Sequence, residues 1–179
     1  MKNKMIGFLS ILLILAMIPL VSANKPTAKA KAKSVKTTVD PSLIAGITAE
    51  TVGSDYCDEA IKAAIIILQT NYKCNSKQFS NAKNSRNNSK IEKYAKELSG
   101  IYIRRGKEAV PVPYFKYSAG YTQPSKKYPY IRESASPWDS FYNKTGTTGV
   151  SLNGINELCN QGLDYKSALN WYLKDIKIT

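Results

Sequence analysis

The sequence contains no histidine and only three cysteines, none of them in a Cys-x-x-Cys pair. Without histidine, neither a Ser–His–Asp triad nor a Cys–His nucleophile pair can be assembled. Zinc sites draw on cysteine and histidine at short spacings, so a zinc centre has no support either. We therefore expect no bound metal and no cofactor.

The three cysteines, Cys57, Cys74 and Cys159, are an odd number. Cys57 and Cys74 bracket a predicted helix whose 15 or so residues would separate them by roughly 22 Å. A disulfide needs Cα atoms within about 7 Å, so these two do not pair with each other if the helix is continuous. Either Cys159 pairs with one of them, or all three are free.

Acidic residues are scarce as well: 13 Asp and Glu stand against 26 Lys and Arg, and the formal net charge is +13. Such an excess indicates a polyanionic partner, or it serves solubility alone. In a cytoplasmic protein the polyanion would be nucleic acid. The choice depends on where the protein goes.

Residues 1–23 have the pattern of a secretory signal peptide. Lys2 and Lys4 form a positive start, residues 5–20 are almost wholly apolar, and residues 21–23 (VSA) form a small-residue cleavage site. We expect cleavage and secretion, with a retained membrane anchor as the alternative. An exported basic protein meets bacterial wall polymers and anionic lipid headgroups, so we expect no nucleic-acid partner.

Residues 24–39 form a low-complexity linker rich in lysine and alanine. Such a segment buries too little apolar surface to fold. We interpret it as a disordered tether that contacts anionic wall polymers, or as a plain spacer. Residues 40–179 then form a single domain.

The rest of the chain mixes helical and extended patterns. Residues 58–72 are apolar most of the way round a helix, which predicts a buried central helix with Asp58 as its N-cap. Asp40 followed by Pro41 starts a shorter helix that carries Glu50. Downstream we expect a helix over 91–98, a hairpin over 101–117, an extended piece over 128–131, helices over 152–160 and 165–174, and a strand over 175–179. Without βαβ alternation, this mixture predicts an α+β fold.

Several separate stretches, in the right order and spread over roughly residues 40–178, resemble the SpoIID/LytB domain family, named for stage II sporulation protein D and the amidase enhancer LytB. They are residues 47–50 (ITAE), 59–72 (EAIKAAIIILQTNY), 118–123 (SAGYTQ), 129–139 (PYIRESASPWD), 149–155 (GVSLNGI) and 162–172 (GLDYKSALNWY).

The resemblance implies a cell-wall enzyme of sporulation or wall remodelling, a lytic transglycosylase acting on peptidoglycan glycan strands that lack stem peptides. Glu50 matches the family's catalytic glutamate, acting first as acid and then as base. Its apolar neighbours favour a raised pKa, as an acid role needs. The substrate-binding residues that the resemblance implies are Gln69, Tyr72, Ser118, Gly120, Tyr121, Thr122, Gln123 and Ser151.

A second reading keeps the binding surface without the reaction. In family members, Arg and Tyr occupy the positions that are Gln69 and Asn71 here. A protein with these changes would bind glycan or stimulate a cell-wall amidase, as the LytB branch does. The many tyrosines of residues 114–130 suit either reading, because aromatic rings stack on sugar faces.

Overall fold

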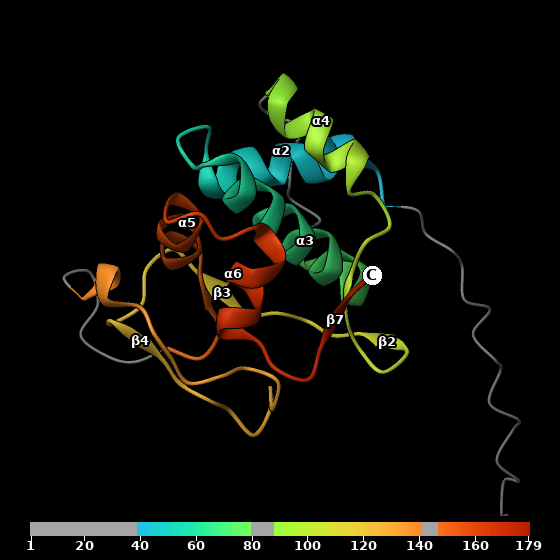
Figure 1. The fold of residues 1–179 in the computed structure, drawn as a ribbon. Coiled ribbons are helices and arrows are strands. Elements are labelled where there is room, and N and C mark those ends of the chain that lie inside the picture. The colour runs from blue at the N-terminus through green and yellow to red at the C-terminus, as the bar shows by residue number, and fades with distance from the viewer. Residues whose placement is uncertain (1–38, 80–87, 141–146) are drawn as a thin grey trace, which may run out of the picture. The chain divides into compact units, whose positions relative to one another are not determined.

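The computed structural model describes residues 39–79, 88–140 and 147–179 (Figure 1). The predicted signal peptide and nearly all of the predicted linker lie outside these ranges. The described residues fall in one compact unit. Within them, no helix combines the length and the apolar character needed to cross a membrane.

The fold is α+β, as predicted from the sequence. The helices are α2 (Pro41–Val52), α3 (Asp58–Cys74), α4 (Ser89–Glu97), α5 (Leu152–Asn160) and α6 (Tyr165–Tyr172), with 3-10 turns η1 (Ser76–Phe79) and η2 (Pro137–Asp139). The strands are β1 (Ile103–Arg105), β2 (Glu108–Ala109), β3 (Tyr114–Phe115), β4 (Tyr121–Thr122), β5 (Ser134–Ala135), β6 (Val150–Ser151) and β7 (Lys177–Ile178).

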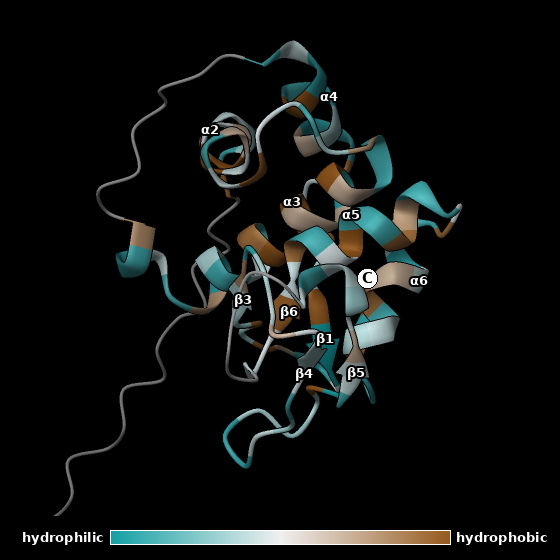
Figure 2. Cartoon of the chain, turned by 90° about the vertical axis from the view of Figure 1, so that its left-hand side faces the viewer, coloured by the Kyte–Doolittle hydropathy of each residue, from teal (hydrophilic) through white to brown (hydrophobic). Residues whose placement is uncertain are grey.

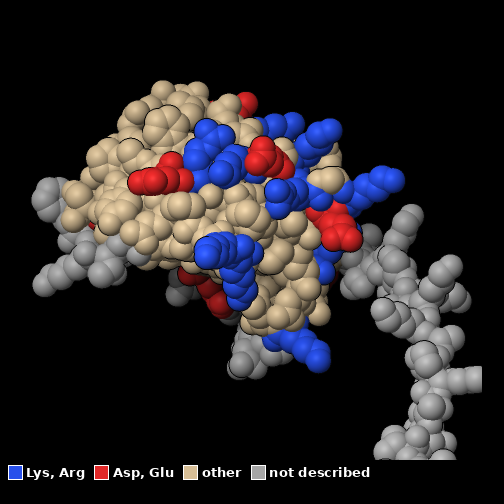
Figure 3. Space-filling model, turned by 90° about the horizontal axis from the view of Figure 1, so that it is seen from below, with Lys and Arg blue, Asp and Glu red and all other residues tan. Residues whose placement is uncertain are grey.

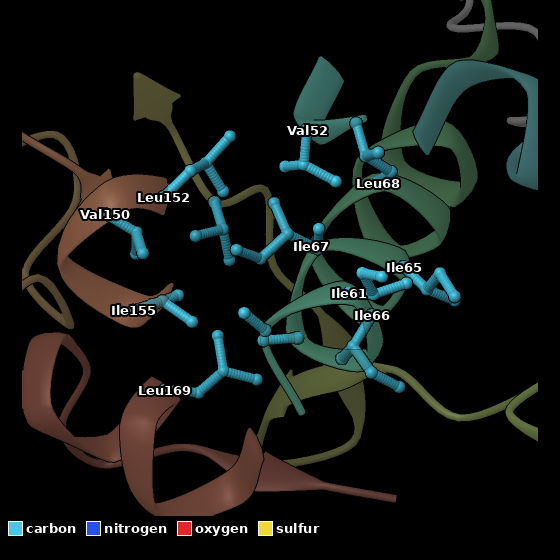
Figure 4. Close-up of a cluster of buried hydrophobic side chains, with 14 of the residues drawn as sticks. Val52, Ile61, Ile65, Ile66, Ile67, Leu68, Val150, Leu152, Ile155 and Leu169 are labelled. Atoms are coloured by element: carbon cyan, nitrogen blue, oxygen red, sulfur yellow. The ribbon is translucent and has the colours of Figure 1, made fainter. Parts of the chain in front are cut away.

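Helix α3 is the centre of the core, as its apolar circumference predicts. Ile61, Ile65, Ile66 and Ile67 are all fully buried. Figure 4 shows side chains of α2, α5 and α6 meeting those of α3. The β-branched run lowers helix propensity, so packing from several sides must hold this helix.

The predicted start of α3 is wrong by one residue. Cys57 is the N-cap, and Asp58 is the first helical residue. The Asp58 carboxylate instead accepts a hydrogen bond from Tyr94 Oη at 2.7 Å and pairs with Lys90, which lowers the pKa of Asp58. Asp58 therefore ties α3 to α4 and does not cap its own helix. The start of α2 follows the prediction, because Asp40 accepts from Ser42 N at 2.9 Å and Pro41 follows it.

The predicted hairpin over 101–117 is correct only for its first part. Strands β1 and β2 pair across the turn, and β7 joins β1 on the other side. The second arm does not continue, because Pro111 and Pro113 have no N–H to donate to a partner strand. Beyond them, β3 pairs in parallel with β6, with Tyr114 opposite Val150.

The extended piece predicted over 128–131 is a turn instead, closed by Ile131 N donating to Tyr128 O at 2.9 Å. Only Ile131 makes an isolated bridge, to Leu173. The turn places Tyr130 inward, where its hydroxyl donates to the Pro111 carbonyl.

Asp164 caps α6, and its Oδ1 accepts from Ser167 N at 2.7 Å. The hydrogen bonds from Ser167 lower the pKa of Asp164 below its usual 3.8. A carboxyl with a lowered folded-state pKa adds stability above its unfolded pKa, and that stability is lost as pH falls through the folded pKa. We expect Asp164→Ala to cost about 1 kcal/mol at neutral pH. Urea unfolding should show this cost disappearing in strong acid; an equal cost at both pH values would contradict the cap's role.

Helices α5 and α6 approach closely at Gly154. A Cβ on Gly154 would collide with Tyr172 Oη and Ser136 Oγ. Tyr172 is fully buried and cannot swing aside. We expect Gly154→Ala to lower the free energy of unfolding by about 1–3 kcal/mol, measured by urea denaturation. The matched control is Asn170→Ala on the exposed side of α6, and equal stability of the two variants would contradict the packing argument.

Candidate functional site

A fully buried carboxyl group, that of Asp139 in η2, gathers hydrogen bonds from three separate segments. Its Oδ2 accepts from Ser118 N at 3.0 Å, Ser118 Oγ at 2.9 Å and Ser136 Oγ at 2.8 Å. Ser151 Oγ donates to the same oxygen, and Asn153 Nδ2 donates to Oδ1 at 2.9 Å. We call Asp139, Ser118, Ser136, Ser151 and Asn153 the Asp139 cluster.

The Asp139 cluster joins three of the segments that carry the family resemblance. Ser118 begins residues 118–123, Ser136 and Asp139 end residues 129–139, and Ser151 belongs to residues 149–155. Ser151 also caps α5, since its hydroxyl accepts from Gly154 N at 3.0 Å. Three stretches distant in sequence are therefore fixed against one another by a single side chain.

Two further predicted residues lie beside this cluster. Gly120 has a positive φ of 88°, and its carbonyl accepts from Ser136 N at 2.7 Å. Thr122 is buried, and its hydroxyl donates to Arg132 O at 2.9 Å. Both hold strand β4 against β5, so their contacts position the chain.

Glu50 lies in the last turn of α2 with its side chain exposed. Burial raises the pKa of Tyr114. A hydrogen bond between the Tyr114 hydroxyl and Thr51, the neighbour of Glu50, acts in the opposite direction. This contact places the carboxyl-terminal end of α2 against strand β3. Figure 2 shows β3 and β6 side by side.

Tyr56 lies in the loop after α2, close enough to Asp139 for the two side chains to interact electrostatically. Burial raises the pKa of Tyr56 to about 12, and the nearby Tyr117, Asp139 and Glu157 act in the same direction. The Tyr56 hydroxyl is buried and has no hydrogen-bond partner among the described residues. We call Tyr56, Tyr114 and Tyr117 the tyrosine group. Tyr56 follows α2 in the chain, Tyr114 contacts Thr51 of that helix, and Tyr117 precedes Ser118 of the Asp139 cluster.

Gln69 and Tyr72 are not brought to this cluster. Gln69 is 2% exposed, and its Nε2 donates to the carbonyl oxygens of Leu98, at 2.9 Å, and Ile101. Tyr72 is half-buried near the far end of α3, where its ring centroid lies 5.8 Å from that of Phe79. The contacts of Gln69 hold the chain that leaves α4 against α3.

Asn71 stands where members of the family that the sequence resembles have tyrosine. Its side chain also hydrogen-bonds the backbone. Its amide donates to Val112 O at 2.8 Å and accepts from Val112 N at 2.7 Å. This pairing fixes the segment that leads into β3. Tyr121 and Gln123 lie at the surface and contact each other, with Gln123 Nε2 3.4 Å from Tyr121 Oη.

A pocket of about 490 Å³ lies beside β5 and α6. Trp171 lines it, is 42% exposed, and donates from Nε1 to Ala135 O at 2.9 Å. None of the predicted site residues lines this pocket. We place the candidate site at the Asp139 cluster, where three motif segments meet, because this pocket has only its volume in its favour.

The surface is basic on the face shown in Figure 3, where lysine and arginine side chains outnumber acidic ones. Within the described ranges, no group of three or more Cys, Asp or Glu side chains is placed to hold a metal ion.

Sequence reasoning missed Asp139 and Ser136 as site residues, although both stand in a segment it singled out. The signal was present in the Ser-Pro-Trp-Asp ending of residues 129–139, but nothing in the sequence marks that aspartate as buried.

No family model matches the chain, and no curated protein matches its sequence.

Proposed function

We propose that this protein acts on peptidoglycan glycan strands as a lytic transglycosylase, with Glu50 as its acid and base. The observation that carries the proposal is the convergence of residues 118–123, 129–139 and 149–155 on the Asp139 carboxyl. Segments picked out by resemblance alone need not meet in space. Their meeting supports the resemblance from which the activity is proposed.

In the proposed reaction, the protonated Glu50 carboxyl donates its proton to the oxygen that leaves C1 of MurNAc. The C1–oxygen bond breaks, and the sugar's own 6-hydroxyl attacks C1. The Glu50 carboxylate then takes the hydroxyl proton, which leaves a 1,6-anhydro end and consumes no water. Because Glu50 is exposed in the free protein, a bound strand would supply the desolvation that an acid role needs.

The residues of the tyrosine group are half-buried, and Tyr114 contacts Thr51 at the end of α2. Rings in such positions stack on sugar faces while their hydroxyls reach polar groups. We assign sugar contact to these rings and assign positioning to the Asp139 cluster, whose side chains are occupied with one another.

The proposal includes secretion through residues 1–23 and attachment to anionic wall polymers through the Lys-rich residues 24–39, with no nucleic acid as partner. Residues 1–38 lie outside the described residues, and Val39, the last residue of the predicted linker, is buried in the core. The basic face of Figure 3 supports an anionic partner. The alternative, solubility alone, predicts no retention on wall material at physiological salt.

A second function, glycan binding or activation of a cell-wall amidase without cutting, is favoured by two observations. Glu50 is exposed, and the side-chain amides of Gln69 and Asn71 donate hydrogen bonds to backbone carbonyl oxygens. An error of about 1 Å in the position of a proton donor costs about 100-fold in rate.

The deciding experiment incubates the protein with glycan strands stripped of stem peptides and reads the products by mass spectrometry. New 1,6-anhydro-MurNAc ends are the result expected of a transglycosylase. Strands that are pulled down intact would instead establish the binding function. Neither cutting nor binding would overturn both proposals.

A further inference from the structure

Two of the three cysteines come together where α3 meets α5. Cys57 is the N-cap of α3, and Cys159 is one turn along α5 from Asn156. Cys57 N donates to Asn156 Oδ1 at 2.9 Å, and Cys57 Sγ lies 4.0 Å from Asn156 O. The face of α5 that carries Asn156 and Cys159 therefore lies against the start of α3.

The chemical surroundings agree with this placement. Burial raises the pKa of Cys159 to about 12, and the charge and hydrogen bond of the adjacent Cys57 side chain act in the same direction. Cys159 is 8% exposed, whereas Cys57 is half-buried and open to a reagent. Cys74 lies exposed at the other end of α3, roughly 25 Å away along the helix.

We propose that Cys57 and Cys159 form a disulfide that fastens the start of α3 to α5. The reaction needs an oxidant, and we assign that role to a second disulfide, on a small molecule or a thiol oxidoreductase. The Cys57 thiolate attacks one sulfur of the oxidant and expels the other as a thiolate. The Cys159 thiolate then attacks the Cys57 sulfur of this mixed disulfide and expels the second thiolate.

Atoms and electrons balance in this reaction. The two cysteines lose two protons and two electrons, the new sulfur–sulfur bond forms, and the oxidant leaves as two thiols. Disulfides persist in oxidising compartments, so formation in the cell rests on the secretion proposed above. The pairing in purified protein does not rest on it, and this separates the two claims.

The disulfide would close a loop of about 100 residues, which restricts the unfolded chain strongly. It would also fix Tyr56, the residue before Cys57, relative to α5. The bridge therefore connects the stability of the core with the position of the tyrosine group.

The test equilibrates the full chain with glutathione disulfide or with dithiothreitol, blocks free thiols, and maps the digest by mass spectrometry. We expect a Cys57–Cys159 linked peptide and a free Cys74 thiol in the oxidised sample. The oxidised form should melt about 10 °C higher than the reduced form. Both Cys57 and Cys159 remaining alkylatable after oxidation would overturn the proposal, as would a bridge through Cys74.

Three variants serve as controls. Cys74→Ser should keep the oxidised-minus-reduced difference in melting temperature, while Cys57→Ser and Cys159→Ala should each abolish it. Serine is a favourable N-cap, so Cys57→Ser is expected to fold. If Cys159→Ala does not fold, the comparison of Cys57→Ser with Cys74→Ser still decides the question.

Discussion

Replacing Glu50 by glutamine is expected to lower the rate of 1,6-anhydro end formation by about 100- to 10,000-fold. Glutamine keeps the length and shape of the side chain but has no proton to give to the leaving oxygen and takes none from the 6-hydroxyl. The measurement is the initial rate of new 1,6-anhydro-MurNAc ends on stripped glycan strands, by mass spectrometry with an internal standard. Binding of intact strands should change little, because the proposed contacts of the tyrosine group remain.

The matched control is Glu97→Gln, at the last residue of α4, which is exposed like Glu50 and pairs with Lys93 at 3.9 Å. It removes one carboxylate from an exposed helix end and should leave the rate unchanged. Equal rates for wild type and Glu50→Gln would remove Glu50 from the reaction. An equal loss in both variants would point to overall charge in place of a catalytic carboxyl.

Asp139→Ala is expected to lower the free energy of unfolding by about 3–5 kcal/mol, because several hydrogen bonds to one buried acceptor are lost together. The alanine would leave Ser118, Ser136, Ser151 and Asn153 without the acceptor on which they converge. Buried donors that lose their partner cost more than the hydrogen bond itself contributed. Urea denaturation followed by circular dichroism measures the effect.

Graded variants separate this cluster from a general cost of mutation. Ser136→Ala removes one donor and should cost about 1 kcal/mol. Asp139→Asn keeps the shape but places an amide donor against hydroxyl donors, so it should fall between the two. Asp55→Ala, at an exposed position in the loop after α2, should stay within about 0.5 kcal/mol of wild type. A cost of Asp139→Ala no larger than that of Ser136→Ala would contradict the shared-acceptor argument.

The helices could be predicted because their signals are local. Each signal involves residues close together in the chain, and the structure has a helix at each one. The signals are the apolar pattern of residues 58–72, the Asp40–Pro41 start and Asp164 before α6. The strands were harder because strands of two or three residues carry too few side chains to show alternation. The parallel pairing of β3 with β6 depends on residues 36 positions apart, with Tyr114 opposite Val150.

The candidate site was predictable only in part, for a similar reason. The segments were identified by their residues, but their roles within the fold depend on tertiary contacts. Gln69 and Asn71 could have faced a ligand or the backbone, and only the fold shows their amides bonded to Leu98, Ile101 and Val112. For Asp139, the local sequence shows no sign of a role, and only the fold shows that its carboxyl accepts hydrogen bonds from three segments.

The enclosure of α3 has a consequence for how the molecule opens. The amide hydrogens of Ile65, Ile66 and Ile67 are sealed by side chains from several helices, so their exchange with solvent requires the whole core to separate. In the short strands β4 and β5, Thr122 and Ser134 are buried, but Tyr121 and Ala135 are exposed where the two strands pair. Fluctuations of the β4–β5 pair can therefore be more frequent than opening of the central helix, which lets this part of the surface adjust to a bound strand without unfolding the protein.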